Sequence, residues 1–561
     1  MLDVVARSHR GRICEYRTGD VSVRTPYIIT SEGGIRISHE GRSRTLHAAD
    51  AEIPLDPKIL TTLSYRENGA PAIFGNVCVA RLPIPEEFTV PEETEMVVVP
   101  NAFELRNNPR KLVDSVIRLR ESVGYGRIVC MLGIAEPSTL ALLTYMGADM
   151  FDDSLVRAAG LSRTRLIPEG EIRAEGDASE DNAAELGREC SKVHTFAEAG
   201  RLRELVDQRA PSSPRTVAAL RIFDRVGYEY QEEACPTVGD KFACSTTQAL
   251  KRPDLRRYRE TLSERYSKPR HKRILLLLPC SARKPYHISK THKAFASAIH
   301  TAQHDTLVHE VIVTSPLGAV PRELDVFYPA NSYDIPVTGE WKCEEKAMIR
   351  EMIAARIAEG YDRVICHLGE DAELVRGLAD MVETAVGDST SPASLKNLDA
   401  ALREAAKGMS PADDYTDRRE TVRSILAFQF GKEAADLIMD ENTYATGKFP
   451  YWKIVREDPA DRKNKTQLGM ITPERGMISL TLEGAEVLAG KFNSVEMTDF
   501  EMKGNLFAIG VVSADQGLRI GDEAVVTLNG KVKAVGVAAM SGREMQDLRR
   551  GIAVRVRHKS K

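Results

Sequence analysis

Residues 273–406 alternate apolar runs with amphipathic segments, and this alternation restricts the fold more than any other feature of the sequence. The run RILLLL opens the region, and LVHEVIVTS and DRVICHL are two further apolar runs. We predict that each run is a buried strand and that His292–Gln303 and Cys343–Glu359, which lie between the runs, are helices. Because strands that alternate with helices form parallel sheets, the region predicts a small doubly wound α/β domain.

The chain is too long for this to be its only domain. It has 561 residues, whereas one hydrophobic core serves about 250 residues at most. Apolar runs at Glu95–Pro100 and Arg127–Leu132 predict a second α/β domain over residues 1–266. Helical and aromatic strand-like stretches predict a small α+β domain over 414–470, and short strands with Gly-containing turns predict a β-rich barrel or sandwich over 472–561.

The composition excludes several classes of protein. Hydrophobic residues make up 42% and charged residues 28% of the chain, as in soluble globular proteins. The best apolar run, Ile274–Leu278, is too short to cross a bilayer, and the N-terminus lacks the apolar segment of a signal peptide, so we expect a cytoplasmic protein without membrane segments. Nine cysteines without framework spacing argue against disulfides, and a net charge of −4 does not by itself indicate nucleic-acid binding.

The loop PCSARKPYHISKTH, Pro279–His292, follows the first predicted strand of the middle domain. Ligands of doubly wound sheets bind beyond the carboxyl ends of the strands, so a site is expected here. The loop carries a thiol, an ammonium, a phenol, a hydroxyl and an imidazole, which are the side chains of Cys280, Lys284, Tyr286, Ser289 and His292. The same composition also fits an ordinary polar loop that leads into a helix capped by Ser289.

These groups suit the addition of a nucleophile to an electrophilic carbon such as that of a nitrile. The neighbouring cations Arg283 and Lys284 are expected to lower the pKa of the Cys280 thiol and make it nucleophilic. The thiolate can form a thioimidate, which an amine then displaces to leave an amidine. His292 can move the protons, and Tyr286 can donate to the developing anion or stack on a base. Direct attack by the amine, and a buried structural role for Cys280, stay open as alternatives.

The spacing P-C-x3-K-P-Y-x2-S-x2-H resembles the signature of the archaeosine synthase family, archaeal paralogues of the tRNA-guanine transglycosylases. The segment Val313–Trp341 is similar to the middle domain of that family. Gly11–Ile29 and Gly147–Ser154 resemble transglycosylase segments, and the second matches the nucleophilic aspartate of those enzymes with Asp152. The resemblance implies that residues 1–266 form a transglycosylase-type TIM barrel and that Asp152 contacts the base or ribose, a solvated loop carboxylate being the alternative.

The resemblance is incomplete at the transglycosylase zinc site. The motif of that family is C-x-C-x2-C with a distant histidine, whereas the corresponding stretch here, CPTVGDKFAC, offers Cys235 and Cys244 alone. Because zinc sites normally have four ligands, we expect no intact site of that type. Zinc held through these two thiols is the one cofactor that the sequence suggests.

Residues 472–561 resemble a PUA domain, an RNA-binding module, in Arg475–Leu488, Gly517–Thr527 and Val535–Lys559. The last segment carries a cluster of cations that can neutralise phosphates. The predicted RNA-binding residues are Arg549, Arg550, Arg555, Arg557 and Lys559. An ordinary solvated basic tail is the alternative.

The resemblance implies a function in tRNA modification. Archaeosine synthases act on 7-cyano-7-deazaguanine in the D-loop of tRNA, adding free lysine, or glutamine in other accounts, to its nitrile. Asp325, Asp334 and Glu340 are candidates for holding the ammonium group of that amino acid, and solvated loop acids are the alternative for each of them. A radical-SAM partner subunit then releases archaeosine, and because this sequence has no CxxxCxxC motif, a radical step belongs to such a partner in a heteromeric complex. A base-exchanging tRNA-guanine transglycosylase and a non-catalytic tRNA-presenting subunit are the two alternatives.

Overall fold

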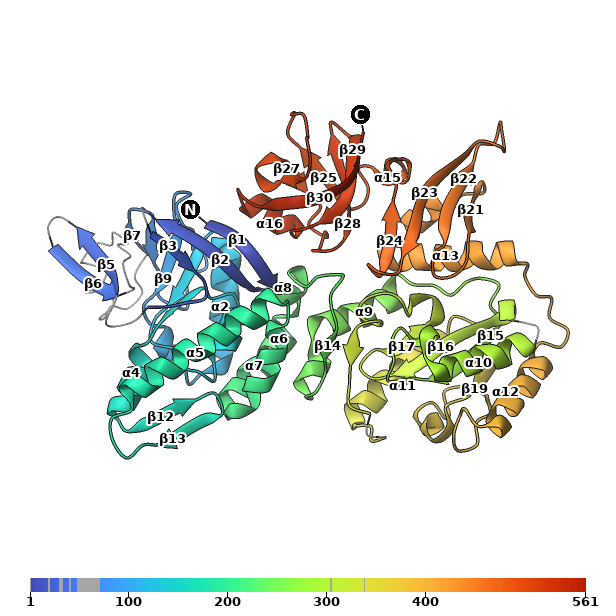
Figure 1. Cartoon of the computed structure of the whole chain (residues 1–561), viewed down its shortest axis with the longest axis horizontal. Helices are drawn as coiled ribbons and strands as arrows, with labels where there is room; N and C mark the ends of the chain where they lie inside the picture. Colours follow the sequence, from blue (N-terminus) through green and yellow to red (C-terminus); the bar gives the residue numbers. More distant parts are fainter. Residues whose placement is uncertain are drawn as a thin grey trace.

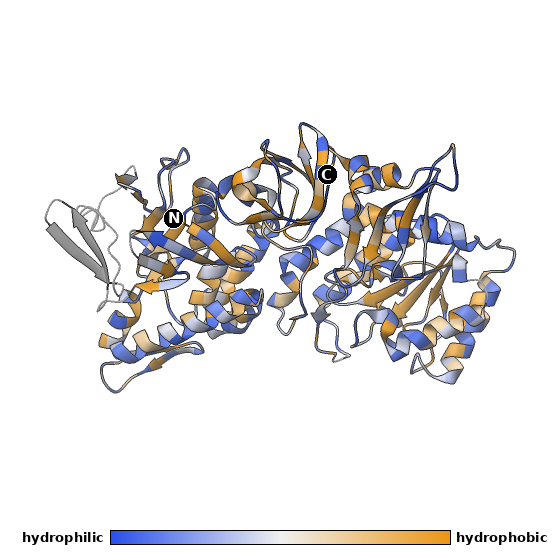
Figure 2. Ribbon diagram, turned by 45° about the horizontal axis from the view of Figure 1, so that its top comes forward, coloured by the Kyte–Doolittle hydropathy of each residue, from blue (hydrophilic) through white to orange (hydrophobic). Residues whose placement is uncertain are grey.

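The computed structural model describes residues 2–18, 21–29, 34–39, 42–47, 71–302, 305–337 and 339–560. The N-terminal and middle domains lie at opposite ends of an elongated molecule, with the C-terminal domain between them and a small α+β domain beside the middle domain (Figure 1). Hydrophobic residues concentrate on the strands inside each domain (Figure 2). Among the helices described, none combines the length and apolar character needed to span a bilayer.

The N-terminal domain is built around a six-stranded sheet in which five neighbouring strands run parallel. In spatial order the strands are β4 (Tyr27–Ile29), β11 (Met150–Asp152), β10 (Ile128–Met131), β9 (Met96–Val99), β8 (Val77–Val79) and the antiparallel β7 (Ala72–Phe74). Strands β9 and β10 confirm the two apolar runs predicted as buried parallel strands, since all of their residues are buried.

This sheet is not the closed eight-stranded barrel that the resemblance implied, because β4 and β7 are its edges in the part of the chain that the structure describes. Beyond β11 the chain forms helices and a separate hairpin, β12 (Thr164–Ile167) with β13 (Gly170–Arg173), which supply no strand to the sheet. The helices of the domain are α2 (Pro109–Val123), α3 (Leu140–Tyr145), α4 (Ser154–Leu161), α5 (Ser179–Glu198), α6 (Leu202–Arg209), α7 (Pro214–Val226) and α8 (Tyr228–Glu233).

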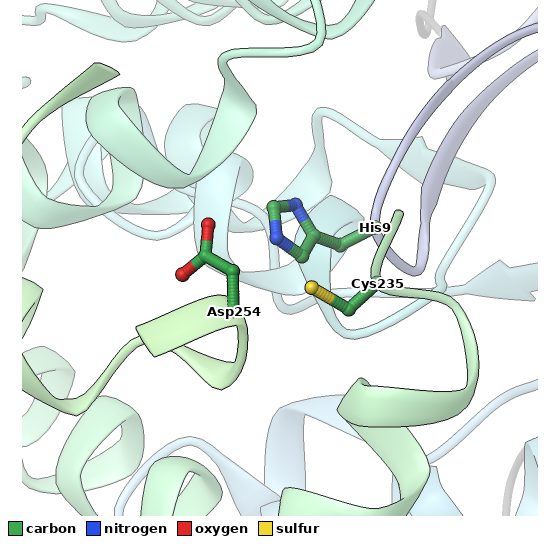
Figure 3. Close-up of side chains that lie close together, drawn as sticks. All are labelled: His9, Cys235 and Asp254. Carbon is green, nitrogen blue, oxygen red and sulfur yellow. The ribbon is translucent and has the colours of Figure 1, made fainter. Parts of the chain in front are cut away.

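Two smaller antiparallel sheets flank the N-terminal domain. One contains β1 (Leu2–Ser8), β2 (Gly11–Thr18) and β3 (Val21–Arg24), and the other pairs β5 (Gly34–His39) with β6 (Arg42–His47). Strands β1 and β2 are joined by a two-residue turn in which His9 adopts a left-handed φ of 57°. This turn lies next to the segment that leads into the middle domain (Figure 3).

The middle domain contains a five-stranded α/β sheet whose strands are parallel except for the antiparallel edge strand β17 (Gly318–Pro321). Its strands lie in the order β17, β16 (Val308–Thr314), β15 (Ile274–Pro279), β19 (Arg363–Cys366) and β20 (Val382–Glu383), and β15 is parallel to both neighbours. The helices are α9 (Pro253–Glu264), α10 (Lys290–Thr301), α11 (Cys343–Ile357) and α12 (Pro392–Ala405). The end of the predicted first helix, Gln303, lies outside the described residues. A parallel pair, β14 (Phe242–Ala243) with β18 (Tyr333–Asp334), adjoins the sheet.

Both faces of strand β15 are buried, which explains its unbroken apolar sequence. Ile274, Leu276 and Leu278 pack with α10 and α12, whereas Leu275 and Leu277 belong to the larger core that includes α9 and α11. Because successive side chains of a strand point to opposite faces, an all-apolar strand requires a helix layer on each side. This packing fixes the loop after β15 at the carboxyl edge of the sheet.

The two remaining regions have the secondary structure that the sequence predicts. Helices α13 (Asp414–Phe430) and α14 (Lys432–Ile438) pack with a sheet of β21 (Thr443–Thr446), β22 (Lys453–Glu457), β23 (Lys465–Thr472) and β24 (Met477–Leu480), so this sheet continues beyond residue 472. After α15 (Leu482–Leu488), the C-terminal domain has the sheet order β26 (Leu506–Phe507), β30 (Ile552–Lys559), β29 (Lys531–Ala538), β28 (Glu523–Leu528), β25 (Ser494–Met497) and β27 (Val511–Ala514), with helix α16 (Gly542–Asp547).

Candidate functional site

The thiol of Cys280 and the ammonium of Lys284 lie together beyond the carboxyl end of β15. Cys280 directly follows the strand and is half-buried, and the Thr314 hydroxyl at the end of the neighbouring β16 is its hydrogen-bond partner. The ammonium of Lys284 lies 4.1 Å from the centre of the Tyr333 ring, a cation–π contact, and interacts electrostatically with Cys280 and Asp334. Two of the five loop residues proposed from the sequence, Cys280 and Lys284, therefore interact with one another.

Burial controls the protonation of this pair. It raises the pKa of the Cys280 thiol, and the hydrogen bond from Thr314 and the charge of Lys284 oppose this only in part. Lys284 does lower this pKa, as expected of a neighbouring cation, but desolvation has the larger effect, so the expectation of a net lowered pKa is wrong. Burial also lowers the pKa of Lys284, despite the favourable charges of Cys280 and Asp334. The two pKa values are thus shifted in opposite directions, which makes proton exchange between thiol and amine easier.

Tyr286 lies beneath the loop rather than in contact with solvent. Its side chain is fully buried, and its hydroxyl hydrogen-bonds with the hydroxyls of Thr314 (3.4 Å) and Tyr333. A further hydrogen bond of 2.6 Å joins Thr314 to Tyr333. Because the ring is enclosed on all sides, Tyr286 does not offer the free face that stacking on a base requires. It holds Thr314 and Tyr333 in position against the thiol and the ammonium.

His292 and Ser289 also lie inside the protein. Burial lowers the pKa of His292 to about 3, so the ring is neutral near pH 7. Arg322 donates a 2.7 Å hydrogen bond to His292 Nδ1, which leaves the proton of the neutral ring on Nε2. The Ser289 hydroxyl accepts from the backbone N–H of His292 and caps helix α10, as the alternative explanation of the loop predicted.

The three carboxylates considered for an amino-acid ammonium have different surroundings. Asp325 is fully buried and accepts hydrogen bonds from the backbone and ring of His287 and from Arg322, so its oxygens already have partners. Asp334 is exposed and close to Lys284. Glu340 is also exposed and lies six residues after the end of β18. Of these carboxylates, Asp334 interacts electrostatically with Lys284.

Two residues that the sequence did not single out complete the edge of the site. Thr314 ends β16, and Asp371 lies in a 3₁₀ helix, η7 (Gly369–Leu374), that follows β19. Asp371 accepts a 2.7 Å hydrogen bond from the Trp341 indole and acts electrostatically on Cys280. Thr314 lies at the end of one predicted strand and Asp371 shortly after another, and these positions are the signal from which they could have been found.

Asp152 belongs to a different sheet from this loop. It ends β11 in the N-terminal domain and accepts a 2.6 Å hydrogen bond from the backbone N–H of Gly133. Burial raises the pKa of its carboxyl group. The structure does not place Asp152 in the group formed by Cys280 and Lys284, because β11 and β15 lie in separate domains (Figure 1).

The two cysteines of the incomplete zinc motif have separate environments. Cys235 is fully buried and lies with His9 and Asp254, whose ligand atoms are all within 4.8 Å of one another (Figure 3). Cys244 is also buried, but it directly follows β14. Its backbone N–H donates a hydrogen bond to the backbone carbonyl of Asp334. The incomplete zinc site that the sequence suggested combined Cys235 with Cys244, whereas the structure groups Cys235 with two residues distant in sequence.

The five cations near the C-terminus that were predicted to bind RNA differ in their exposure to solvent. Arg549, Arg550, Arg555 and Lys559 are exposed, and Arg549 has a distant surface contact, 3.7 Å, with Glu92. Arg557 is instead half-buried, pairs with Glu523 and donates a 2.7 Å hydrogen bond to the Leu480 carbonyl. Arg557 therefore joins the C-terminal domain to the neighbouring α+β domain.

A cavity of about 820 Å³ opens between α8, α9, α13 and the C-terminal domain, away from the Cys280 loop. Several of its charged lining residues are paired with one another, as Glu232 is with Arg257 (3.2 Å) and Arg519 (2.8 Å). We therefore interpret this cavity as a space where domains meet and assign the chemistry to the Cys280 loop, where a nucleophile and a proton carrier converge.

Known proteins resemble this chain along most of its length. An archaeosine synthase subunit alpha from Thermoplasma acidophilum is 32% identical over 83% of this chain and 88% of its own length. The chain belongs to the archaeosine synthase family. An archaeosine synthase from Haloferax volcanii is 30% identical over 99% of both chains, and a tRNA-guanine(15) transglycosylase from Methanobrevibacter smithii is 23% identical over 80% of this chain and 69% of its own length.

Two domain families match parts of the chain. Residues 494–559 match the PUA domain, which confirms that part of the expectation for the C-terminal region. Residues 255–402 match a family described as a domain of unknown function, DUF5591. That match contains the whole Cys280 loop, the strands on either side of it and most of the helices that cover them.

Proposed function

We propose that this protein is a tRNA-modifying enzyme of archaeosine biosynthesis that adds an amine, most simply the side-chain amine of free lysine, to the nitrile of 7-cyano-7-deazaguanine in tRNA. Membership of the archaeosine synthase family supports the pathway. The observation that carries the chemistry is the electrostatic interaction of a half-buried thiol, Cys280, with an amine of lowered pKa, Lys284, beyond the carboxyl end of β15. The choice of lysine rests on the family resemblance of the sequence.

The first step forms a thioimidate. Neutral Lys284 takes the proton of the Cys280 thiol, and the sulfur attacks the nitrile carbon. Lys284 then returns this proton to the nitrile nitrogen, so that one C–S bond and one N–H bond form and one bond of the C≡N group breaks. The half-buried position of the pair keeps bulk water from competing for the proton.

The second step releases the enzyme. The incoming amine attacks the thioimidate carbon and loses a proton to Lys284, and the C–S bond then breaks to leave an amidine. The departing thiolate takes the proton from Lys284, so the protein returns to its starting state. Asp334, exposed beside Lys284, is the carboxylate that we assign to the ammonium of the incoming amino acid.

The remaining loop residues act through their neighbours in this proposal. Tyr286 holds Thr314 and Tyr333, Ser289 begins α10, and His292 links the loop to Arg322. A neutral, buried imidazole is poorly suited to carrying protons to and from a substrate, so we assign His292 a positioning role. Exposed cations of the PUA domain, Arg550 and Arg555 among them, would hold tRNA phosphates.

Relatives of this chain carry the name subunit alpha, which supports a partner subunit for the complete conversion. We assign the radical step to that partner. The chain examined alone should then stop at the amidine-linked lysine adduct and not continue to archaeosine.

An adduct assay tests the proposal. The full-length protein is incubated with tRNA that carries 7-cyano-7-deazaguanine and with isotopically labelled lysine or glutamine, and nucleoside masses are read after digestion. The expected product is the nucleoside plus the mass of lysine, absent in Cys280→Ala and retained in Cys343→Ser, which changes an exposed cysteine of α11. Release of free deazaguanine base would instead favour transglycosylation through Asp152, and tight tRNA binding without any product with either amino acid would favour a presenting subunit.

A further inference from the structure

Three residues from distant parts of the sequence meet where the N-terminal domain joins the middle domain. His9 occupies the β1–β2 turn, Cys235 follows α8, and Asp254 lies in the first turn of α9. A histidine nitrogen, the cysteine sulfur and a carboxylate oxygen all lie within 4.8 Å of one another (Figure 3). All three side chains are buried. An imidazole, a thiol and a carboxylate are the three ligand types that zinc accepts in proteins.

The imidazole of His9 has a feature that packing alone does not explain. The residue is 6% exposed, and neither ring nitrogen has a hydrogen-bond partner among the described residues. Buried polar atoms are nearly always hydrogen-bonded, and each exception calls for an explanation such as an ion or water. His9 also has a left-handed backbone, φ 57°, which is unusual for a residue with a side chain. The turn thus holds an unsatisfied imidazole in a fixed place.

We propose that His9, Cys235 and Asp254 bind one zinc ion that fastens the N-terminal β-hairpin to the start of the middle domain. Zinc normally takes four ligands, with distances of about 2.0 Å to nitrogen and about 2.3 Å to sulfur. The three ligand atoms lie within 4.8 Å of one another, which is close enough for a single ion to be shared among them. His9 also lines a cavity of about 210 Å³, which has room for a water molecule as the fourth ligand.

The protonation states of the three groups agree with metal binding. Burial lowers the pKa of His9 to about 3, so its ring has the neutral form that binds metals. Asp254 is ionised, since the Arg252 guanidinium holds the pKa of its carboxyl group well below the ordinary range. Burial raises the pKa of Cys235 to about 12 in the metal-free protein, and a bound dication would remove that proton. The thiolate and the carboxylate would then balance the two charges of zinc.

The partners of Asp254 fit a metal-ligating carboxylate. Arg252 donates to it at 3.0 Å and Tyr328 at 2.7 Å. Ligating carboxylates commonly accept such outer hydrogen bonds, which hold them in orientation. The guanidinium of Arg252 in turn lies 4.2 Å from the centre of the Phe242 ring in β14, the strand that pairs with β18. The cluster is therefore linked to the strand that carries Tyr333 and Asp334.

A nucleophilic Cys–His–Asp triad is the competing explanation of this grouping. Such a triad needs a hydrogen bond between histidine and aspartate and a thiol that substrate can reach. The His9 nitrogens lack that bond, and Cys235 is fully buried. A metal ion satisfies the same three groups without either requirement.

Metal analysis of the full-length protein tests the proposal. After purification with zinc and removal of loosely bound metal, we expect about one zinc per chain by mass spectrometry. Cys235→Ser and His9→Gln should lower zinc binding at least tenfold, whereas Cys244→Ser, a matched buried cysteine outside the cluster, should retain it. Substitution by cobalt(II) gives a second reading, because a thiolate ligand produces a near-ultraviolet charge-transfer band that Cys235→Ser should abolish.

Two results would overturn the assignment. The first is wild-type protein that, with zinc in excess, holds less than a tenth of an equivalent and gives no cobalt charge-transfer band. The second is a Cys235→Ser protein that keeps the full metal content and the band, since another thiol would then be the ligand. Circular dichroism identifies a variant that does not fold, and the wild-type cobalt spectrum decides whether a thiolate ligand is present even then. None of these readings depends on catalytic activity.

Discussion

The ammonium of Lys284 lies 4.1 Å from the centre of the Tyr333 ring, which holds it beside the Cys280 thiol at the end of β15. The two residues are brought together because β18, which carries Tyr333, pairs with β14 and not with the main sheet. A cation–π contact stabilises the charged ammonium, so Tyr333 favours the return of the proton to Lys284 after each transfer. This contact gives the proposed chemistry its first test.

Lys284→Met should slow formation of the lysine adduct by about 10²–10⁴-fold, the usual contribution of a positioned acid–base group. The variant keeps much of the side-chain volume but cannot move a proton. Single-turnover rates with saturating tRNA measure the effect. Lys293→Met, on the outer part of α10, is the control and should keep the wild-type rate. A Lys284→Met rate within threefold of wild type would remove this residue from the mechanism.

Alkylation of Cys280 should be slow at neutral pH and accelerate as the pH rises above the ordinary thiol range. Burial raises the pKa of this thiol, and the thiolate is the form that reacts with iodoacetamide. Peptide mass spectrometry after timed alkylation follows Cys280 and the exposed Cys343 in the same sample. Lys284→Met should shift the Cys280 profile to still higher pH, because it removes a charge that favours the thiolate. Rapid alkylation of Cys280 below pH 7 would contradict the buried environment.

His292 should make the middle domain less stable as the pH falls. The pKa of this buried imidazole is about 3 in the folded protein, below its ordinary value of 6.5, so its stabilising contribution is present above pH 6.5 and is lost as the pH falls toward 3. Between pH 7.5 and pH 5 the loss is about 2 kcal/mol. The His292→Gln variant lacks this titrating group, so its free energy of unfolding should fall by about 2 kcal/mol less than that of the wild type over the same pH range.

Tryptophan fluorescence during urea unfolding measures this effect, because the only tryptophans, Trp341 and Trp452, lie in the middle and α+β domains. Equal pH dependence in the wild type and the variant would show that another group controls the response.

Arg203 should stabilise the helical part of the N-terminal domain. It is fully buried, with two 2.7 Å hydrogen bonds to Asp224 and one of 3.0 Å to Asp207. Removing one partner leaves buried charge uncompensated, so Arg203→Met should cost about 3–5 kcal/mol. The exposed pair of Arg110 and Asp114 provides the control, since Arg110→Ala should change stability by about 0.5 kcal/mol or less. Calorimetry of both variants makes the comparison, and equal changes would contradict it.

Arg550 and Arg555 should contribute to tRNA binding through phosphates. Replacing both by alanine should weaken binding and lower the slope of log affinity against log salt by about two, one for each lost phosphate contact. Arg557→Ala should act differently, because Arg557 pairs with Glu523 inside the protein. We expect that variant to lose thermal stability and to keep the wild-type salt slope. Filter binding at several salt concentrations separates the two effects.

The sequence by itself determined the elements that depend on short-range patterns. The all-apolar run of β15 and the amphipathic helices around it predict a parallel sheet that is covered on both faces. The structure contains β15 between two parallel strands with helices on each side. The position of Cys280 and Lys284 beyond that strand follows directly from the chain order. The match to the PUA domain likewise rests on residues close in sequence.

Only the tertiary structure decided the properties that depend on burial and on contacts between distant segments. Cys280 was expected to have a lowered pKa from its cationic neighbours, but desolvation is larger than their effect, and desolvation cannot be read from adjacent residues. In the part of the chain that the structure describes, the sheet of the N-terminal domain has two edges, because its later segments form helices and a separate hairpin. His9, 226 positions before Cys235 in the sequence, meets it because the β1–β2 turn reaches the domain junction. No local sequence pattern indicates that His9 and Cys235 lie close together, because their proximity depends on how whole domains pack.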